Sequence, residues 1–361
     1  MKDLLLLLSM LLLGNVCLSQ TDLPHPLKPA MPDLPAITLE EAGMKADTID
    51  KLLDLIHTTK PFDFRGMVVI KDEKLVVEEY FKTYWRATIH DIRSAGKSVT
   101  ALLLGIAIDQ GLVESIEQDV FDFFPAFKKP NQVPIKLKHL LTMSSGLDAD
   151  VFDEESPGNA INWVAKDDWV AHVLSLSMKF EPGEKWVYND ACAMLIGAVI
   201  EEKSGMKLAD FAKEHLFDPL GITEYYWYSG AGNRTGPMGN LYLSALDFAK
   251  IGAVVLHKGR WKEKQVVSES WIAEITQPRL DIEAQNPFAK SYGYFWYIST
   301  VTIDGKSFEY VFAAGNGGNL LIIVPEEKLV VSLISSAYGE GRGEFRSNII
   351  FQYVLKSIKQ D

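Results

Sequence analysis

Cysteine is almost absent from this chain. Its 361 residues contain only Cys17 and Cys192. Cys17 lies in an N-terminal apolar segment of the kind that is removed on export, and after removal only one thiol would remain. One thiol excludes an intramolecular disulfide. Cys192 lies in an apolar run of helical character, and this position predicts a buried, inert thiol.

Positive charge is also scarce. The chain has 36 Lys and Arg residues against 48 Asp and Glu residues, which gives a formal net charge of −12. A protein without a basic surplus has little with which to neutralise phosphates, so nucleic acid is not an expected partner. A negatively charged membrane surface is disfavoured for the same reason. We therefore expect a small-molecule substrate, and the oligomeric state stays open.

Two common catalytic patterns are missing from the sequence. No Gly-x-Ser-x-Gly motif occurs, although a Ser–His–Asp hydrolase of the α/β type would be expected to carry one. The seven histidines never stand close enough together for a local two-histidine metal motif. His139, at a predicted helix start, is interpreted as structural. We expect neither a metal ion nor another cofactor.

The first 45 residues differ from the rest. Lys2 is followed by a leucine-rich run, and the small residues Cys17 and Ser19 precede Gln20. This pattern predicts a signal peptide over residues 1–19, cleaved after Ser19, and hence a periplasmic or secreted protein. A lipid anchor on Cys17 is the alternative. The apolar run is too short to span a bilayer comfortably, and residues 20–45 read as a proline-rich linker.

The remaining residues, 46–361, read as one domain of the α+β class. Short strand patterns come early and late in the chain, and we expect them to meet in one antiparallel sheet flanked by helices. A mainly helical lobe is inserted between them, over residues 100–285 or so, and a cleft between the lobes would be a common place for an active site. The predicted strands are 66–70, 75–81, 294–298, 300–303, 308–313, 319–324 and 329–335. The predicted helices are 46–57, 98–110, 135–142, 163–176, 191–203, 208–216, 245–257 and 344–358.

The most informative segment is Ser94-Ala95-Gly96-Lys97, which opens a long apolar helix. A serine and a lysine three residues apart share one helix face, so their side chains can touch. A neutral lysine amine can accept the serine's proton and make the serine a nucleophile. The helix N-terminus also favours developing negative charge. The competing interpretation is that Ser94 only caps the helix and that Lys97 only extends to solvent.

A second Ser-x-x-Lys match, Ser204-Gly205-Met206-Lys207, has a different context. It follows a charged stretch and reads as the end of a helix, with Gly205 as a left-handed cap. We therefore assign the chemistry to Ser94 and Lys97.

Two further segments could complete a site around Ser94. Tyr188 ends a Pro-Gly loop just before a predicted helix, and a tyrosine near cationic groups can have a lowered pKa and move a proton. Tyr188 could equally be a packing residue, and Asp190 could simply cap that helix. The run Ala313-Ala314-Gly315-Asn316-Gly317-Gly318 places glycines in a predicted strand. Glycine there indicates either a bulged turn or a close backbone approach that could present an N–H group to an oxyanion.

Four segments in this order resemble the serine β-lactamase/penicillin-binding superfamily. They are Ser94–Lys97, His139–Leu147, Pro182–Asp190 and Ala313–Gly318, and they lie within a resemblance covering roughly residues 60–361. Within the superfamily the chain looks most like the class C β-lactamase-like group, in its esterase and 6-aminohexanoate-dimer hydrolase branch.

The resemblance implies a role for each of these positions. Ser94 would be the acylated nucleophile, Lys97 its general base and Tyr188 the proton relay to the leaving group. The backbone N–H groups of Ser94 and Asn316, next to Gly315, would form the oxyanion hole. The expected function is hydrolysis of an ester or amide bond through an acyl-serine intermediate.

The sequence departs from the superfamily pattern twice. Ala313 stands where β-lactamases and penicillin-binding proteins carry a lysine or histidine, so a cation that would hold a substrate carboxylate is missing. Asp190 replaces the asparagine of the Tyr-x-Asn motif, where it would repel an anionic substrate and, if close to Lys97, keep that lysine charged. Both departures favour neutral or amine-bearing substrates. A β-lactamase or D-amino-acid peptidase, an acyltransferase, and a non-catalytic binding or sensor protein on the same fold remain alternatives.

Overall fold

The computed structural model describes residues 34–61, 63–339 and 341–359. The predicted signal peptide, Cys17 and residues 20–33 of the predicted linker lie outside the described residues. Residues 34–45 of that linker pack against the fold, because Leu34, Ala42 and Met44 are buried and Ala36 bridges to Leu75. Within the described residues, no helix is both long and apolar enough to cross a membrane.

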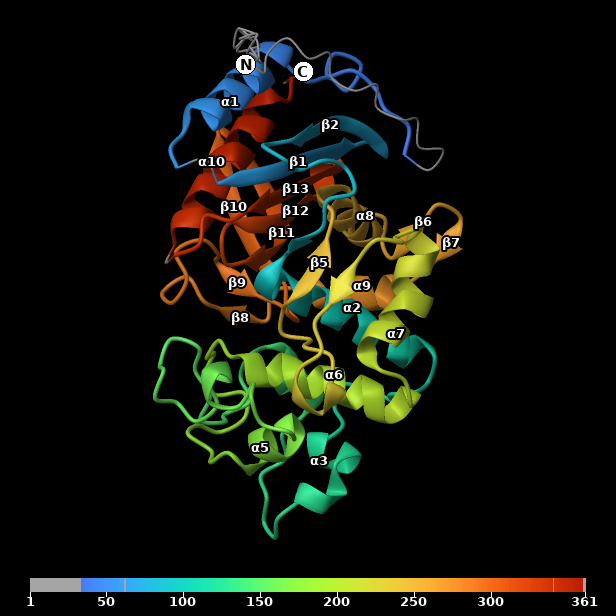
Figure 1. Cartoon of the computed structure of the whole chain (residues 1–361), viewed down its shortest axis with the longest axis vertical. Coiled ribbons are helices and arrows are strands. Elements are labelled where there is room, and N and C mark those ends of the chain that lie inside the picture. Colours follow the sequence, from blue (N-terminus) through green and yellow to red (C-terminus); the bar gives the residue numbers. More distant parts are fainter. Residues whose placement is uncertain (1–33, 62, 340, 360–361) are drawn as a thin grey trace, which may run out of the picture.

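The centre of the fold is an eight-stranded antiparallel sheet in the order β2-β1-β13-β12-β11-β10-β9-β8 (Figure 1). Its strands are β1 Phe64–Lys71, β2 Lys74–Tyr80, β8 Leu280–Asp281, β9 Ser291–Tyr292, β10 Tyr297–Ile303, β11 Lys306–Gly315, β12 Asn319–Val324 and β13 Leu329–Ser335. β1 pairs with β13, so the early and late strands meet in one sheet as the sequence predicts. Five further short strands are β3 His90–Asp91, β4 Tyr226–Trp227, β5 Leu241–Leu243, β6 Arg260–Trp261 and β7 Lys264–Gln265.

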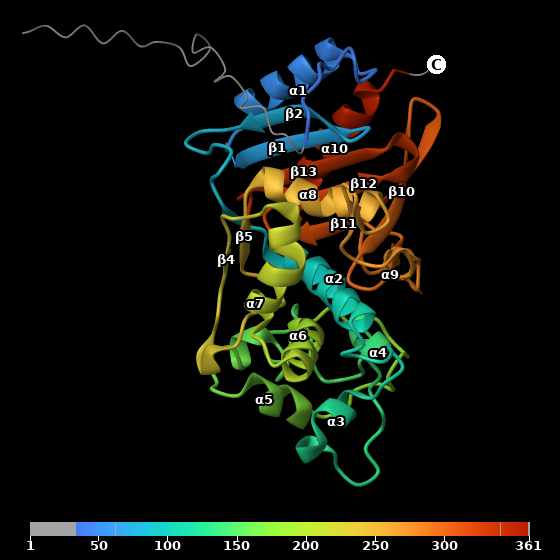
Figure 2. The same ribbon diagram turned by 90° about the vertical axis from the view of Figure 1, so that its right-hand side faces the viewer.

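Helices cover both faces of this sheet and build the other half of the molecule (Figures 1 and 2). The α-helices are α1 Ala46–Thr58, α2 Gly96–Asp109, α3 Val120–Phe123, α4 Leu137–Leu141, α5 Trp169–Ser175, α6 Asp190–Ser204, α7 Leu208–Ala212, α8 Ala245–Leu256, α9 Glu269–Ile275 and α10 Arg342–Ser357. α1 and α10 pack together on one face, and α8 packs on β1, β12 and β13 from the other. α3, α4, α5 and α6 form the lower part in the view of Figure 2.

The expected α+β architecture with an inserted helical lobe is confirmed, with local differences in the elements. α8 falls inside the predicted lobe, yet it packs on the sheet. The helix predicted over 163–176 is only α5, which starts at Trp169 with Asp168 as its N-cap. The two strands predicted over 294–298 and 300–303 form a single strand, β10. This strand begins only at Tyr297, because Phe295 has a φ of 60° that interrupts the extended backbone before it.

α2 joins the sheet to the helical part. Its residues from Gly96 to Ala107 are all buried, because it contacts α6 on one side and β11 on another. The apolar sequence of this helix therefore reflects burial on all its faces, as predicted. The preceding short 3-10 turn η1, Arg93–Ala95, lies against β11. Ser94 and Lys97 consequently lie where the two parts of the molecule meet.

Candidate active site

Ser94 lies in η1, one turn before the body of α2. The N-cap residue of α2 is Ala95, and no side chain makes a capping hydrogen bond there. The interpretation of Ser94 as a helix cap is therefore wrong. Its hydroxyl instead lies 3.1 Å from Lys97 Nζ.

Lys97 is 1% exposed, so the interpretation that it extends to solvent is wrong as well. Its Nζ lies 2.7 Å from Asp190 Oδ1 and 2.6 Å from the backbone oxygen of Met238. Together with Ser94 Oγ, these atoms give the three hydrogen-bonding directions of an ammonium group a partner each. A buried charge is tolerated only when it is paired, and these three partners fix the Lys97 amine beside the serine hydroxyl.

Asp190 is the first residue of α6, but it does not cap that helix. The N-cap is Asn189, whose Oδ1 accepts a hydrogen bond from the Cys192 N–H at 2.9 Å. Capping by Asn189 leaves the Asp190 carboxylate available to pair with Lys97. The close contact between Asp190 and Lys97 that the sequence analysis considered is therefore present.

Tyr188 lies beside the Ser94–Lys97 pair. Lys97 Nζ lies 5.1 Å from the centre of its ring, and Ser94 and Tyr297 are close enough to the phenol to affect its pKa. The expected lowering of its pKa is wrong. Burial raises the pKa of Tyr188, and the nearby Asp190 charge raises it further, while the hydrogen bonds to Ser94 and Tyr297 lower it less. Tyr188 is therefore a protonated phenol at neutral pH.

The glycine-rich segment after β11 lies against the serine turn. A Cβ on Gly315 would come within 2.0 Å of the Ile92 backbone oxygen, so the close backbone approach predicted for this segment is present. Neither the Ser94 N–H nor the Asn316 N–H donates any of the turn and loop backbone hydrogen bonds of the described residues. Their donation to an oxyanion stays a prediction.

Hydrogen bonds hold the turn after β11, which carries Asn316, in shape. Asn319 Nδ2 donates to the Asn316 carbonyl at 3.0 Å, and Asn319 Oδ1 accepts from the Ser335 N–H at 3.1 Å. The Gly317 carbonyl accepts from the Ala337 N–H at 3.1 Å. Gly317 has a φ of 96°, a conformation that favours glycine. The turn is thus positioned by the end of β13 as well as by β11.

Sequence reasoning missed three residues of this arrangement. Met238 contributes only a backbone oxygen, which no residue pattern reports. Tyr297 lies at the start of a strand, where an aromatic residue is ordinary. Asn319 is fully buried in β12, and a polar residue at the first position of an apolar strand was the one signal that could have identified it.

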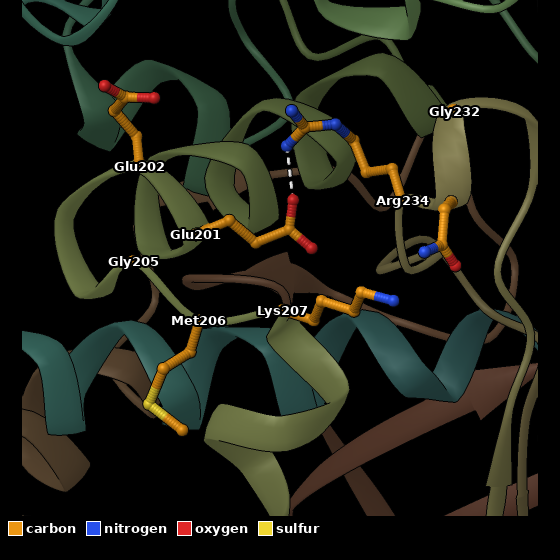
Figure 3. A pocket seen from close by; sticks show the side chains of 8 residues that line it. Glu201, Glu202, Gly205, Met206, Lys207, Gly232 and Arg234 are labelled. Carbon is orange, nitrogen blue, oxygen red and sulfur yellow. Dashed lines mark hydrogen bonds and ion pairs between the residues drawn. The ribbon is translucent and has the colours of Figure 1, made fainter.

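The second Ser-x-x-Lys match lies elsewhere and has no such environment. Gly205 ends α6 with a φ of 67°, as predicted, and Lys207 is exposed at a surface pocket (Figure 3). In that pocket Arg234, from the glycine-rich loop after β4, pairs with Glu201.

The two remaining residues assessed from the sequence have structural environments. His139 Nδ1 accepts from the Lys136 N–H at 3.3 Å at the start of α4, and burial lowers its pKa. Cys192 is buried in α6, and burial raises its pKa to about 11, which agrees with an inert thiol. Within the described residues, no group of three His, Cys, Asp or Glu side chains is arranged to hold a metal ion.

A protein-family model described as Beta-lactamase matches residues 58–353. The chain belongs to the Beta-lactamase family. This match includes all four motifs on which the sequence resemblance depends, and it confirms that resemblance at the level of the family.

The curated relatives of this Beta-lactamase family member include a penicillin-binding protein and an esterase. Penicillin-binding protein 4* of Bacillus subtilis (strain 168) is 30% identical over 149 residues, which cover 39% of this chain and 31% of that protein. Lovastatin esterase of Penicillium rubens is 27% identical over 161 residues, or 38% of this chain and 39% of that protein. The chain thus spans less than half of the length of these two curated relatives.

A solved structure shows the same fold over nearly the whole chain. It is described as "Putative 6-aminohexanoate-dimer hydrolase from Bacillus anthracis", and it aligns with a TM-score of 0.72 at 18% identity. The alignment covers 91% of this chain and 89% of the other. At this level of identity the comparison establishes the fold and leaves the substrate open.

Proposed function

We propose that this member of the Beta-lactamase family is a serine hydrolase that cleaves an ester or amide bond through an acyl-Ser94 intermediate. The observation that carries the proposal is the 3.1 Å contact between Ser94 Oγ and the Nζ of a fully buried lysine. A buried lysine amine held in contact with a serine hydroxyl is positioned to exchange a proton with it.

In the acylation step Ser94 Oγ attacks the substrate carbonyl carbon and its proton passes to the amine form of Lys97. The carbonyl oxygen becomes an oxyanion, which the N–H groups of Ser94 and Asn316 stabilise. The bond to the leaving group then breaks, and that group takes a proton from the Tyr188 hydroxyl, which Lys97 replenishes. Water repeats the sequence on the acyl-serine and releases the acid.

The raised pKa of Tyr188 is consistent with this role. A protonated phenol can donate to the leaving group and receive a proton back in one relay, whereas a stable phenolate could not donate. The ion pair with Asp190 holds Lys97 in place.

The alanine at position 313 favours ester or simple amide substrates over β-lactams and D-amino-acid peptides. Its side chain is buried in β11 and provides no cation for a substrate carboxylate. Arg93, next to Ser94, pairs with Asp91 at 3.2 Å and lies over the Tyr338 ring. Its charge is therefore already engaged.

The test is intact-protein mass spectrometry after treatment with a fluorophosphonate probe, on the wild type and on Ser94→Ala. A short-chain p-nitrophenyl ester and a chromogenic cephalosporin are assayed alongside. We expect one adduct, absent from Ser94→Ala, together with ester turnover. No adduct and no turnover would replace this proposal with a binding or sensor role. Preferred turnover of the cephalosporin would show that Ala313 does not exclude β-lactams.

A further inference from the structure

Arg93, the residue before Ser94, has an unusual backbone conformation. Its φ is 55°, on the positive side that favours glycine over residues with a side chain. A bulky residue keeps such a conformation only where neighbouring contacts outweigh the strain, and these positions cluster at active sites. Because Arg93 precedes the peptide bond to Ser94, its conformation sets the direction of the Ser94 N–H group and hydroxyl.

The contacts that hold Arg93 come from Asp91. Asp91 Oδ1 accepts a hydrogen bond from the Arg93 backbone N–H at 2.8 Å, and Asp91 Oδ2 lies 3.2 Å from Arg93 Nε. Asp91 is buried, so these contacts are shielded from water. A hydrogen bond from a backbone N–H to a carboxylate is stronger than one between neutral groups. One carboxylate therefore fixes both the backbone and the side chain of the residue before the proposed nucleophile.

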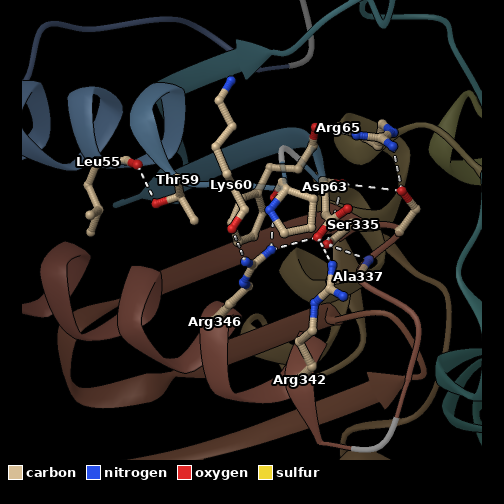
Figure 4. A network of polar contacts seen from close by, with 12 residues as sticks. Leu55, Thr59, Lys60, Asp63, Arg65, Ser335, Ala337, Arg342 and Arg346 are labelled. Carbon is tan, nitrogen blue, oxygen red and sulfur yellow. Dashed lines mark hydrogen bonds and ion pairs between the residues drawn. The ribbon is translucent and has the colours of Figure 1, made fainter.

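Asp91 is itself held from two sides. It lies in β3, which pairs with β5. The preceding residue, His90, has its Nε2 3.1 Å from the carbonyl oxygen of Ser335, at the end of β13. Figure 4 shows Ser335 in the network around Asp63, whose carboxylate pairs with two arginines of α10. The Asp91 carboxylate thus extends from a backbone that is anchored to the main sheet.

The same carboxylate contacts the segment that holds the proposed base. Residues 238–241 lie between the serine turn and β5. Asn240 Nδ2 donates to Asp91 Oδ2 at 3.4 Å, and two residues earlier the Met238 carbonyl accepts from Lys97 Nζ at 2.6 Å. Asp91 is therefore connected to the partner of the lysine as well as to the residue before the serine.

We propose that Asp91 is a positioning residue for the reaction. Its carboxylate holds Arg93 at a positive φ and thereby directs the Ser94 hydroxyl to Lys97 and the Ser94 N–H to the substrate carbonyl oxygen. This inference rests on the proposed function, and Asp91 acts through Arg93 without touching the substrate. Loss of the carboxylate lets residue 93 relax toward negative φ, which rotates the peptide bond to Ser94. A misplacement of about 1 Å at a reacting group can lower a rate about a hundredfold.

The first test measures the rate constant for labelling of Ser94 by a fluorophosphonate, together with kcat and KM for p-nitrophenyl acetate. Asp91→Asn keeps the oxygen that accepts from the Arg93 N–H and removes the charge, whereas Asp91→Glu keeps the charge and displaces the oxygen. We expect Asp91→Asn to stay within about threefold of the wild-type labelling rate. Asp91→Glu and Asp91→Ala should lose at least about tenfold in labelling and in kcat, with little change in KM. The reverse order of Asp91→Asn and Asp91→Glu would overturn the proposal.

Two backgrounds separate the backbone conformation from the ion pair. Arg93→Gly and Arg93→Ala both remove the guanidinium, but only glycine adopts a positive φ without strain. We expect Asp91→Ala to lower the labelling rate at least about tenfold in the Arg93→Ala background and less than about threefold in the Arg93→Gly background. Equal losses in the two backgrounds would show that the effect does not pass through the conformation of residue 93, and the proposal would be wrong.

Asp304→Gly is the matched control for the glycine background. Asp304 has a φ of 50° in the exposed turn between β10 and β11, so glycine there relieves strain far along the chain from the serine turn. It should not reduce the loss caused by Asp91→Ala. If it restores labelling as well as Arg93→Gly does, general stabilisation explains the rescue and the assignment to Asp91 is wrong.

The outcome separates this inference from the proposed function. Circular dichroism and urea unfolding identify the folded variants, and if Asp91→Ala does not fold, the contrast between Asp91→Asn and Asp91→Glu decides. If Ser94 is labelled at the wild-type rate in every Asp91 variant, the hydrolase stands and the positioning role is wrong. If Ser94 of the folded wild type is not labelled, the proposed function is wrong, and this inference is wrong with it.

Discussion

Lys97 Nζ and Asp190 Oδ1 lie 2.7 Å apart and join the first turns of α2 and α6. The side chain of Lys97 is 2% exposed and that of Asp190 is 20% exposed, so the pair is largely shielded from solvent. An ion pair of this kind is screened less by water and salt than a surface pair. It sets the position of the proposed base.

Asp190→Asn should lower ester turnover at least about tenfold, because Lys97 loses the buried charge that pairs with it and holds it beside Ser94. The measurement is kcat/KM for a p-nitrophenyl ester. Asp47→Asn, at an exposed pair with Lys51, is the matched control. Wild-type turnover in Asp190→Asn would show that the pair does not position the proposed base.

Tyr188→Phe should lower kcat by roughly a hundredfold while the protein stays folded, because the leaving group loses its proton donor. Since burial raises the pKa of Tyr188, its titration should not appear as an alkaline limb near pH 10 in the wild type. Tyr226→Phe, at a ring that is 51% exposed, is the control and should keep wild-type turnover. Equal kcat in Tyr188→Phe and wild type would exclude the relay.

Gly315→Ala should both destabilise the protein and impair catalysis. The new Cβ would meet the Ile92 oxygen at 2.0 Å, and backbone movement to relieve it should cost about 1–3 kcal/mol of unfolding free energy. The same movement would displace the Asn316 N–H, so ester turnover should fall at least about tenfold. Urea unfolding and kcat measure the two effects.

Gly236→Ala serves as the comparison for that experiment. Its nearest contact would be an ordinary one at 3.5 Å, to Met238, so it should change neither quantity much. If Gly315→Ala behaved in the same way, the close approach of β11 to the serine turn would have no functional importance.

His90 should make the protein less stable as the pH falls. Burial lowers the pKa of His90 to about 4, and its Nε2 lies 3.1 Å from the Ser335 carbonyl oxygen. Its pKa in the unfolded chain is about 6.5, so the unfolded state takes up the proton first. The stability from neutral His90 is complete above about pH 6.5 and is lost toward pH 4, by roughly 3 kcal/mol.

The measurement for His90 is the free energy of unfolding of the wild type and of His90→Gln across pH 4–8. The variant will be less stable at neutral pH because it loses buried hydrogen bonds, so only the pH dependence is diagnostic. The curve of His90→Gln should be flatter between pH 6.5 and 4. Parallel curves would contradict the assignment.

Several features of this protein could be read from its residues alone. The apolar run after Lys97 requires a helix that is buried on all sides, and the alternating and apolar runs before and after it require strands. The spacing of Ser94 and Lys97 places both side chains on one helix face whatever surrounds them. The motif order was sufficient to predict the family. The signal peptide over residues 1–19 stays a prediction.

Only the tertiary structure decided which polar groups meet. Asp190 pairs with Lys97 because Asn189 takes the capping position, and two adjacent residues that can both cap a helix look alike in a sequence. Burial is the main cause of the raised pKa of Tyr188, and burial of one side chain depends on segments far away in the chain. Lys97 meets the Met238 carbonyl for the same reason: residues 141 positions apart are brought together by packing, which local patterns do not encode.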